Sequence, residues 1–209
     1  MPEAEWQDLF DGKTLDGWTQ RNGEAKYEVE DGVIVGTTVL GTPNSFLCTD
    51  EIYGDFILEL EFKVAPTMNS GVQIRSNSYP EYRNGRVHGY QVEIDPSERA
   101  WTGGIYDEGR RGWLFDLEDD PVAQQAFKQN EWNKFRVECR EESIKTWVND
   151  IPAADLTDFM TARGFIALQV HSTKDEEPHQ VRWRNIRLQD LERAHAEPKS
   201  EKAQKKPAK

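Results

Sequence analysis

Side chains that can exchange protons alternate with apolar side chains in a short segment near the middle of the chain. In residues 89–96, the polar members of this alternation are Gln91, Glu93 and Asp95. Successive side chains of an extended strand point to opposite faces, so these three share one face while their apolar neighbours turn to the other. A carboxylate placed in this way is a candidate general base, and an amide beside it is a candidate hydrogen-bonding partner.

The same alternation recurs in two other segments and adds a cation and an imidazole to the set. Residues 71–76 place Gln73 and Arg75 opposite an apolar face, and residues 164–172 do the same with Gln169 and His171. Any half-exposed sheet carries outward polar residues, so each of these side chains alone also has a structural interpretation. Together they form a richer chemical set than solvent exposure requires, and we interpret them as one site.

Aromatic residues in glycine-rich loops lie between these segments. They include Trp101, Tyr106 and Trp113. Aromatic rings beside amides and carboxylates suit a pyranose, which presents apolar faces and hydroxyl edges. The alternative is that these rings cover the ends of a core. In combination with the polar face, they favour a small sugar as the ligand.

Short strands separated by tight turns must position these residues. Turn signals such as Asp31-Gly32 and Asn84-Gly85 recur along the chain, and helical periodicity is weak. One short helix is expected at 120–129, with Asp120 as its N-cap and Pro121 at its first position. The predicted strands span residues 27–30, 33–36, 45–49, 55–64, 70–75, 90–95, 134–140, 143–148, 164–171 and 180–189. This pattern is all-β and predicts a two-sheet antiparallel β-sandwich of the jelly-roll type.

Length and charge favour one acidic domain followed by a basic tail. The chain has 209 residues, a usual length for one large β domain, and a formal net charge of −12. Residues 193–209 hold six Lys or Arg and two Glu, so residues 1–192 carry a net charge of −16. We expect a single sandwich domain over 1–192 and a disordered tail over 193–209. An acidic body argues against nucleic acid as the partner.

The sequence lacks the motifs of several enzyme classes and any segment long enough to be a membrane-spanning helix. The sequence contains no Gly-x-Ser-x-Gly, no His-Glu-x-x-His, no Walker loop and no dinucleotide fingerprint after a strand. No apolar run approaches the roughly 18 residues that a membrane-spanning helix needs. Cys48 and Cys139 lack metal-ligand spacing and are predicted to be two separate buried thiols, with a single bridge as the alternative in an exported protein.

Six short motifs occur in a fixed order along the chain. They are Phe10–Trp18, Asn69–Ser76, Gly89–Asp95, Thr102–Tyr106, Trp132–Asn133 and Arg184–Leu188. Over about residues 6–191 they resemble the 3-keto-disaccharide hydrolase family. The resemblance implies a concanavalin A-like jelly roll whose concave face is lined by Arg75, Glu93 and His171. It also implies a periplasmic or extracellular location, although residues 1–6 lack the basic and apolar stretches of an export signal, which leaves a cytoplasmic location as the alternative.

The substrate implied by this resemblance is a glycoside oxidised to a ketone at sugar carbon 3. The ketone acidifies the hydrogen on carbon 2, so a base can remove that proton, the aglycone can leave carbon 1, and water can add back. Glu93 or His171 is the expected base, Arg75 the enolate stabiliser, and Tyr106 or His171 the acid for the leaving oxygen. The predicted substrate-binding residues are Asn69, Gln73, Gln91, Asp95, Trp101, Trp113 and Gln169.

Two other functions compete with this prediction. A non-catalytic carbohydrate-binding module or lectin would use the same sandwich, aromatic rings and amides, and a structural domain would present the polar face only to solvent. Catalysis should gather Arg75, Glu93 and His171 in one pocket with perturbed pKa values, whereas a lectin needs few charged groups. The sequence identifies no cofactor with certainty, but a divalent cation held by Glu93, Asp95 and His171 could share the role of enolate stabiliser. The sequence does not predict the oligomeric state.

Overall fold

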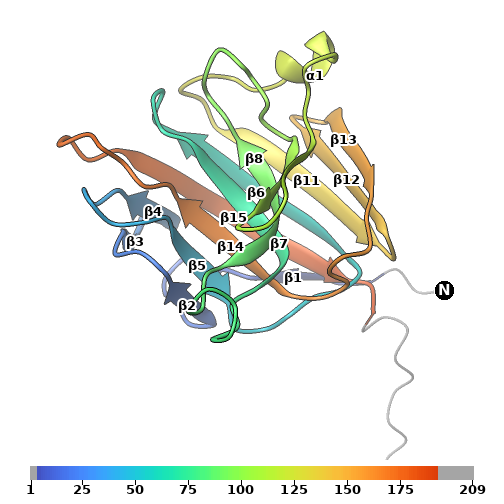
Figure 1. Cartoon of the computed structure of the whole chain (residues 1–209), viewed down its shortest axis with the longest axis horizontal. Helices are drawn as coiled ribbons and strands as arrows, with labels where there is room; N and C mark the ends of the chain where they lie inside the picture. Colours follow the sequence, from blue (N-terminus) through green and yellow to red (C-terminus); the bar gives the residue numbers. More distant parts are fainter. Residues whose placement is uncertain (1–3, 193–209) are drawn as a thin grey trace, which may run out of the picture.

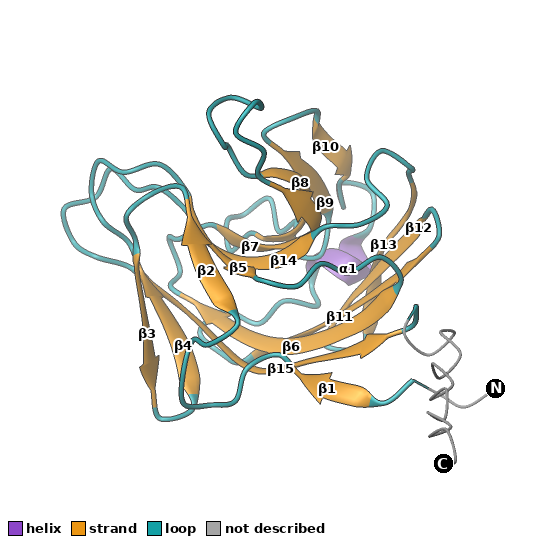
Figure 2. Ribbon diagram, turned by 90° about the horizontal axis from the view of Figure 1, so that it is seen from below, coloured by secondary structure: helices purple, strands orange, loops and turns teal. Residues whose placement is uncertain are grey.

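The computed structural model describes residues 4–192, which fold almost entirely into β-strands arranged in two layers. Figure 1 labels the strands and colours them in chain order. Figure 2 shows the seven-stranded sheet lying over the eight-stranded sheet. All pairings between the named strands are antiparallel. The predicted two-sheet jelly roll is therefore confirmed. The predicted tail, 193–209, lies outside the described residues.

The larger sheet is built around two long central strands, β6 and β15. Within residues 4–192 its order is β13 (Ile151–Thr157), β12 (Ser143–Val148), β11 (Asn133–Arg140), β6 (Phe56–Val64), β15 (Gln180–Asp190), β4 (Val33–Thr37) and β3 (Lys26–Glu30), and β1 (Trp6–Asp8) also pairs with β15.

The smaller sheet contains the three segments whose alternation is described above. Over the same residues its order is β10 (Gly112–Phe115), β9 (Ile105–Glu108), β8 (His88–Ile94), β7 (Ser70–Asn77), β14 (Phe165–Val170), β5 (Ser45–Thr49) and β2 (Trp18–Arg21). The segments with polar alternation are therefore three adjacent strands, β8, β7 and β14. Their polar faces lie side by side.

The main core fills the space between the two sheets, and the alternation assigns its members correctly. The predicted core residues Val92, Ile94, Leu168 and Val170 are all buried in it. From the larger sheet, side chains such as Phe62 and Trp183 pack against them. A strand whose one face is held in this way has a fixed register, so its other face is fixed as well.

Each predicted strand is present, with ends that differ by two residues or fewer. Five further strands, β1, β2, β9, β10 and β13, were not predicted. β9 and β10 lie in a glycine-rich stretch whose sequence predicts loops. β13 contains Pro152, and proline is unfavourable inside a strand. Tertiary pairing overrides these weak local preferences.

The predicted helix is present but shorter than expected. α1 spans Pro121–Gln124, and the Asp120 side chain caps it by accepting hydrogen bonds from the backbone N–H groups of Val122 and Ala123. The predicted cap and first position are correct.

Two further expectations concern the membrane and the thiols. No helix in the described part of the chain is long and apolar enough to cross a membrane. Cys48 and Cys139 are both buried and free, as predicted, and burial raises the pKa of each thiol to about 12.

Candidate functional site

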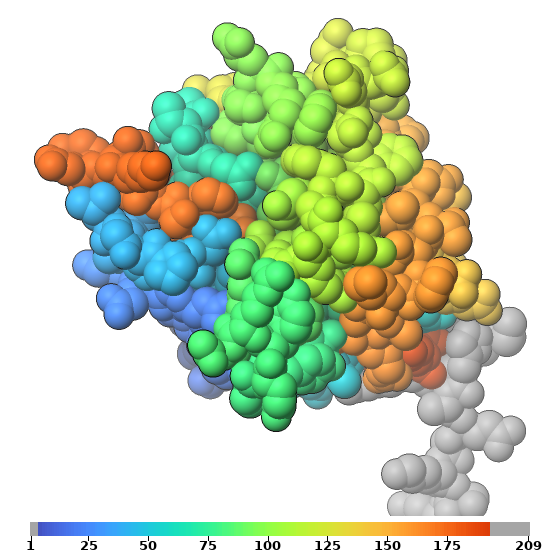
Figure 3. All heavy atoms as spheres, in the orientation of Figure 1, coloured from blue at the N-terminus to red at the C-terminus, as the bar shows by residue number. Residues whose placement is uncertain are grey.

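A cleft of about 820 Å³ opens on the face of the smaller sheet that turns away from the main core. Residues of β8, β9 and β14 line it, together with residues before β5 and before β8. In the space-filling view of Figure 3, the green segment that precedes β8 and the yellow-green segment around β9 and β10 lie beside one another on the molecule. The predicted residues that line the cleft are Asn69, Gln91, Glu93, Tyr106, Trp113, Gln169 and His171.

Glu93 is a nearly buried carboxylate in this cleft, with 4% of its surface exposed. The Asn69 side-chain amide donates a hydrogen bond of 2.5 Å to its Oε1, and the Gln91 amide donates one of 2.8 Å to its Oε2. Burial raises the pKa of Glu93 to about 7, and the two hydrogen bonds to the charged form offset only part of this effect. Near neutral pH, Glu93 therefore exists in both protonation states and can accept or release a proton.

Asp95 follows Glu93 on the same face but does not line the cleft. Burial would raise its pKa, but hydrogen bonds from Ser97 and Arg99 outweigh burial and lower the pKa. Arg99 Nε lies 2.7 Å from Asp95 Oδ2, and the Ser97 hydroxyl lies 2.6 Å from Oδ1. The carboxylate of Asp95 is thus engaged in holding the loop after β8. This placement contradicts its predicted contact with substrate.

His171 lies just after β14 at the edge of the cleft, on the face predicted for it. Its Nδ1 is 2.8 Å from the backbone carbonyl oxygen of Ser172. A carbonyl only accepts hydrogen bonds, so Nδ1 carries the hydrogen in the neutral ring. Nε2 is then the nitrogen left for exchange with a ligand.

Aromatic rings and one arginine form a wall of the cleft. Trp113 meets Tyr106 edge to face at 5.3 Å between ring centroids and meets Trp101 at 4.8 Å. Tyr106 and Trp113 line the cleft, whereas Trp101 contacts Trp113 but does not line the cleft, so its predicted contact with substrate is not supported by its position. The guanidinium of Arg99 stacks on both tryptophans, 4.6 Å from the Trp101 centroid and 5.0 Å from that of Trp113. Arg99 is therefore a positioned cation that lines the cleft.

Arg75 does not line the cleft, and the expectation that it joins Glu93 and His171 there is wrong. Ile74 pairs with Tyr90 and Asn77 with His88, so two residues of β7 oppose one residue of β8 in a β-bulge. Arg75 has a positive φ of 45° in this bulge, which ends the simple alternation of faces.

The Arg75 side chain instead joins the smaller sheet to the larger one. Its Nε donates to the Gly54 carbonyl at 2.8 Å, its Nη1 to the Glu141 carbonyl at 2.7 Å, and its Nη2 to Asp55 at 3.0 Å. With 1% of its surface exposed, this guanidinium has a structural role.

Three glutamines occupy the same face of the three central strands, but they differ in their partners. Gln91 donates to Glu93 and accepts a hydrogen bond of 2.9 Å from the Gln169 amide. Gln73 is fully buried, does not line the cleft, and makes no side-chain hydrogen bond within the described residues. The predicted substrate contact of Gln73 is therefore not supported by its position.

Several residues of the cleft were not predicted from the sequence. They include Arg83, Arg86, Arg99 and Glu108. Arg99 follows Asp95 by four residues in a loop, so strand alternation could not place it. Glu108 follows Tyr106 by two residues, a spacing that would have indicated the same face once β9 was assigned. Arg86 pairs with Glu108 at 3.1 Å across the rim of the cleft.

The residues of the cleft do not fit a metal ion. In the range 4–192, no three His, Cys, Asp or Glu side chains gather as metal ligands would. Of the three residues considered for a divalent cation, Asp95 already has both carboxylate oxygens engaged by Ser97 and Arg99.

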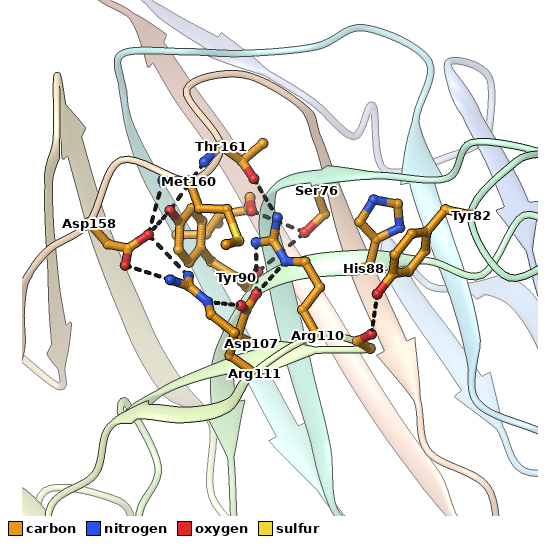
Figure 4. Close-up of polar contacts among 12 residues, drawn as sticks. Ser76, Tyr82, His88, Tyr90, Asp107, Arg110, Arg111, Asp158, Met160 and Thr161 are labelled. Atoms are coloured by element: carbon orange, nitrogen blue, oxygen red, sulfur yellow. Dashed lines mark hydrogen bonds and ion pairs between the residues drawn. The ribbon is translucent and has the colours of Figure 1, made fainter.

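Figure 4 shows a second ionisable cluster. Its strand residues Tyr90 and Asp107 pair with each other and directly neighbour the cleft pair of Gln91 and Tyr106, so they turn to the opposite face of the smaller sheet. The Asp107 side chain of β9 is buried between Arg110 and Arg111, and Arg111 also binds both carboxylate oxygens of Asp158. The Tyr90 hydroxyl donates to the same Asp158. Because Asp107 is next to Tyr106, this cluster holds the back of the strand whose front forms the aromatic wall.

Comparisons of the chain with known proteins support this architecture. Among solved structures, a proposed glycosyl hydrolase from Parabacteroides distasonis is 21% identical with a TM-score of 0.64, covering 89% of this chain and 94% of that one. The carbohydrate-binding module CBM66 from Bacillus subtilis is 16% identical with a TM-score of 0.61, covering 82% and 94%. A β-1,3-1,4-glucanase (lichenase) derived from a mouse hindgut metagenome is 12% identical with a TM-score of 0.59, covering 90% and 100%. At these identities the likeness concerns the fold.

The sequence comparisons identify the family. No curated protein matches the chain significantly. The family model described as a 3-keto-alpha-glucoside-1,2-lyase-like domain matches residues 5–189, which is nearly the whole described range and includes every residue of the cleft. The chain therefore belongs to the 3-keto-alpha-glucoside-1,2-lyase-like family.

Proposed function

We propose that this protein is an enzyme that cleaves 3-keto-glycosides by elimination followed by hydration. The base removes the proton on carbon 2, and the electron pair of that C–H bond forms an enolate with the ketone at carbon 3. The enolate then expels the aglycone oxygen from carbon 1, which leaves a double bond between carbons 1 and 2. Water adds across this bond, so the net reaction is hydrolysis.

The observation that carries this proposal is the nearly buried carboxylate of Glu93 in a cleft of ligand size. A general base works best when its pKa lies near the working pH, and burial brings the pKa of Glu93 to about 7. The neutral amides of Asn69 and Gln91 orient the carboxylate without an ion pair that would reduce its basicity. We assign Glu93 as the base at carbon 2.

Arg99 takes the role of enolate stabiliser that the sequence suggested for Arg75. It is a cation of the cleft, held in place by Asp95 and by stacking on Trp101 and Trp113. A preoriented cation stabilises negative charge that develops on an oxygen during reaction. Its charge also acts on Glu93, whose pKa it lowers against the larger effect of burial.

His171 and the aromatic wall complete the assignment. Nε2 of His171 is the ring nitrogen not engaged by Ser172, and it carries a hydrogen only when the ring is protonated on both nitrogens. We assign this imidazolium as the acid that donates from Nε2 to the leaving oxygen. Tyr106 and Trp113 provide a surface on which a sugar ring can stack. A cleft of about 820 Å³ lies within the usual range for small-molecule sites.

A carbohydrate-binding module without catalysis is the second candidate, and the likeness to CBM66 favours it. Binding alone would use the aromatic wall and the amides. It gives no reason for a carboxylate with a pKa near 7 beside a positioned arginine. This difference makes the enzyme the better-supported candidate.

One experiment separates the two candidates. The protein is incubated with a 3-keto-glucoside and, in parallel, with the unoxidised glucoside, and the released aglycone is measured. Solvent deuterium incorporated at carbon 2 of the recovered ketosugar reports proton removal. We expect release and exchange only with the ketone. Binding of the unoxidised sugar, with no exchange or release from the ketosugar, would establish the binding module instead.

A further inference from the structure

The Gln91 side chain of β8 crosses over β7, the middle one of three strands in the floor of the cleft. β8 and β14 lie on either side of β7, and neighbouring strands are about 4.8 Å apart, so side chains of the outer two do not normally meet. Yet Gln169 of β14 donates a hydrogen bond of 2.9 Å to Gln91 of β8. The crossing occurs where Gly71 of β7 stands between Glu93 on one side and Gln169 on the other.

The space above Gly71 is occupied by the Gln91 side chain. A Cβ atom at position 71 would lie 2.5 Å from Cδ of Gln91, 2.6 Å from its Cγ and 2.8 Å from its Nε2. Any other residue here would therefore displace Gln91. The backbone of Gly71 gives no other reason for glycine, because its φ is outside the left-handed region. Glycine inside a strand otherwise weakens it, which indicates a packing or functional reason for its presence.

The crossing fixes how Gln91 presents its amide to Glu93. Gln169 donates to the carbonyl oxygen of Gln91, so the amide nitrogen of Gln91 is turned toward the carboxylate. Without the space above Gly71, Gln91 could not bridge these two partners.

We propose that Gly71 is a positioning residue, whose missing side chain lets Gln91 cross over β7 and hold the carboxylate of Glu93 for reaction. This role rests on the proposed function only in so far as Glu93 acts as the base. The geometric part concerns only Gly71, Gln91 and Glu93 and is testable without substrate. It assigns to the Asn69–Ser76 motif a role that involves no contact between Gly71 and the ligand.

The test is a double-mutant cycle read by the titration of Glu93. The side-chain carboxyl carbon of Glu93 is followed by NMR against pH in the parent, Gly71→Ala, Gln91→Ala and the double variant, and it is assigned by its loss in Glu93→Gln. A hydrogen bond from Gln91 favours the charged carboxylate, so losing it raises the pKa by about one unit. We expect this rise in each single variant and no further rise in the double variant.

The outcomes separate a positioning role from a structural one. The proposal is overturned if Gly71→Ala titrates like the parent, or if its shift adds in full to that of Gln91→Ala. If Gly71→Ala fails to fold while the double variant folds, the clash with Gln91 is established and the proposal stands. If neither folds, Gly71 is needed independently of Gln91 and the proposal is wrong. A parent that titrates as described but cleaves no ketosugar contradicts the proposed function and leaves the positioning role intact.

Discussion

The two faces of the smaller sheet carry ionisable clusters whose carboxylates respond differently to their surroundings. Glu93, in the cleft, receives hydrogen bonds from neutral amides, and burial raises its pKa to about 7. On the other face burial also opposes the charged form of Asp158, but the two-pronged contact with Arg111 and the hydroxyl of Tyr90 outweigh it and lower the pKa to about 2. Asp158 is also less buried, with 18% of its side chain exposed.

The comparison shows that burial and the charge of the hydrogen-bond donor together decide what these two carboxylates can do. Amides orient Glu93 without neutralising it, so its proton remains exchangeable near neutral pH. A guanidinium fixes Asp158 in its charged form, which serves to join the loop after β13 to the β9–β10 hairpin. One cluster is thus suited to chemistry and the other to holding the strand behind it.

Glu93→Gln should have the largest effect on turnover. The amide keeps the shape of the carboxylate but cannot accept the carbon 2 proton, so we expect kcat/KM on a 3-keto-glucoside to fall about 10³-fold, equivalent to about 4 kcal/mol. Glu108→Gln is the matched control, because Glu108 is a second carboxylate of the cleft and is paired with Arg86. We expect it to cost less than about tenfold. Equal losses in the two variants would contradict the assignment of the base.

The parent and Glu93→Gln should also differ in how their stability depends on pH. The pKa of Glu93 is raised from an ordinary 4.5 to about 7, so the folded state holds this proton longer than the unfolded state does. The parent therefore loses stability as pH rises from about 4.5 to 7, by up to about 3 kcal/mol, and Glu93→Gln lacks this loss. Denaturant unfolding of both proteins at several pH values measures it. Parallel curves would show that Glu93 titrates normally.

Replacing Arg99 and Arg75 in turn tests whether the first is catalytic and the second structural. Arg99→Met should lower kcat/KM about 100-fold because Arg99 lines the cleft. It should lower the thermal midpoint less than Arg75→Lys does, because the Arg99 side chain that pairs with Asp95 is 42% exposed. Arg75→Lys should do the reverse, since it breaks contacts of a buried guanidinium to Gly54 and Glu141. If Arg75→Lys lost turnover while retaining its thermal midpoint, the sequence-based role for Arg75 would be restored.

These two arginines also show how far the sequence could predict the site. Alternation places Gln91, Glu93 and Gln169 on one face correctly, because their strands are regular and held by the core. It fails at Arg75, where a bulge with positive φ redirects the side chain.

Arg99 and the Asp158 cluster were beyond sequence reasoning for a different reason. Arg99 is placed by a loop, and the partners Tyr90 and Asp158 are separated by 68 positions along the chain. Such contacts depend on the tertiary fold rather than on local periodicity. The fold itself was predicted because most strands are long enough to show the period-two pattern.

Asp158→Asn should affect stability and leave the chemistry of the cleft unchanged. Loss of the paired contact with Arg111 should cost about 2 kcal/mol at neutral pH. Because the pKa of Asp158 is lowered from 3.8 to about 2, its contribution is present above about pH 4 and is lost as pH falls toward 2. The difference between parent and variant in free energy of unfolding should shrink over that window. The pKa of Glu93 should stay at about 7, and a shift of half a unit or more would show that the two clusters are coupled through β8 and β9.

Tyr106→Phe should have the smallest effect, and it decides which group protonates the leaving oxygen. Tyr106 faces the cleft beside Gln91, and its ring contacts Trp113. If His171 is the acid, Tyr106 contributes mainly its ring, and removal of the hydroxyl should change kcat/KM by less than about threefold. Tyr106→Ala, which removes the stacking surface, should raise KM about tenfold while kcat changes less. A loss near 100-fold in kcat for Tyr106→Phe, with KM unchanged, would identify the Tyr106 hydroxyl as the acid and leave His171 as a substrate-binding residue.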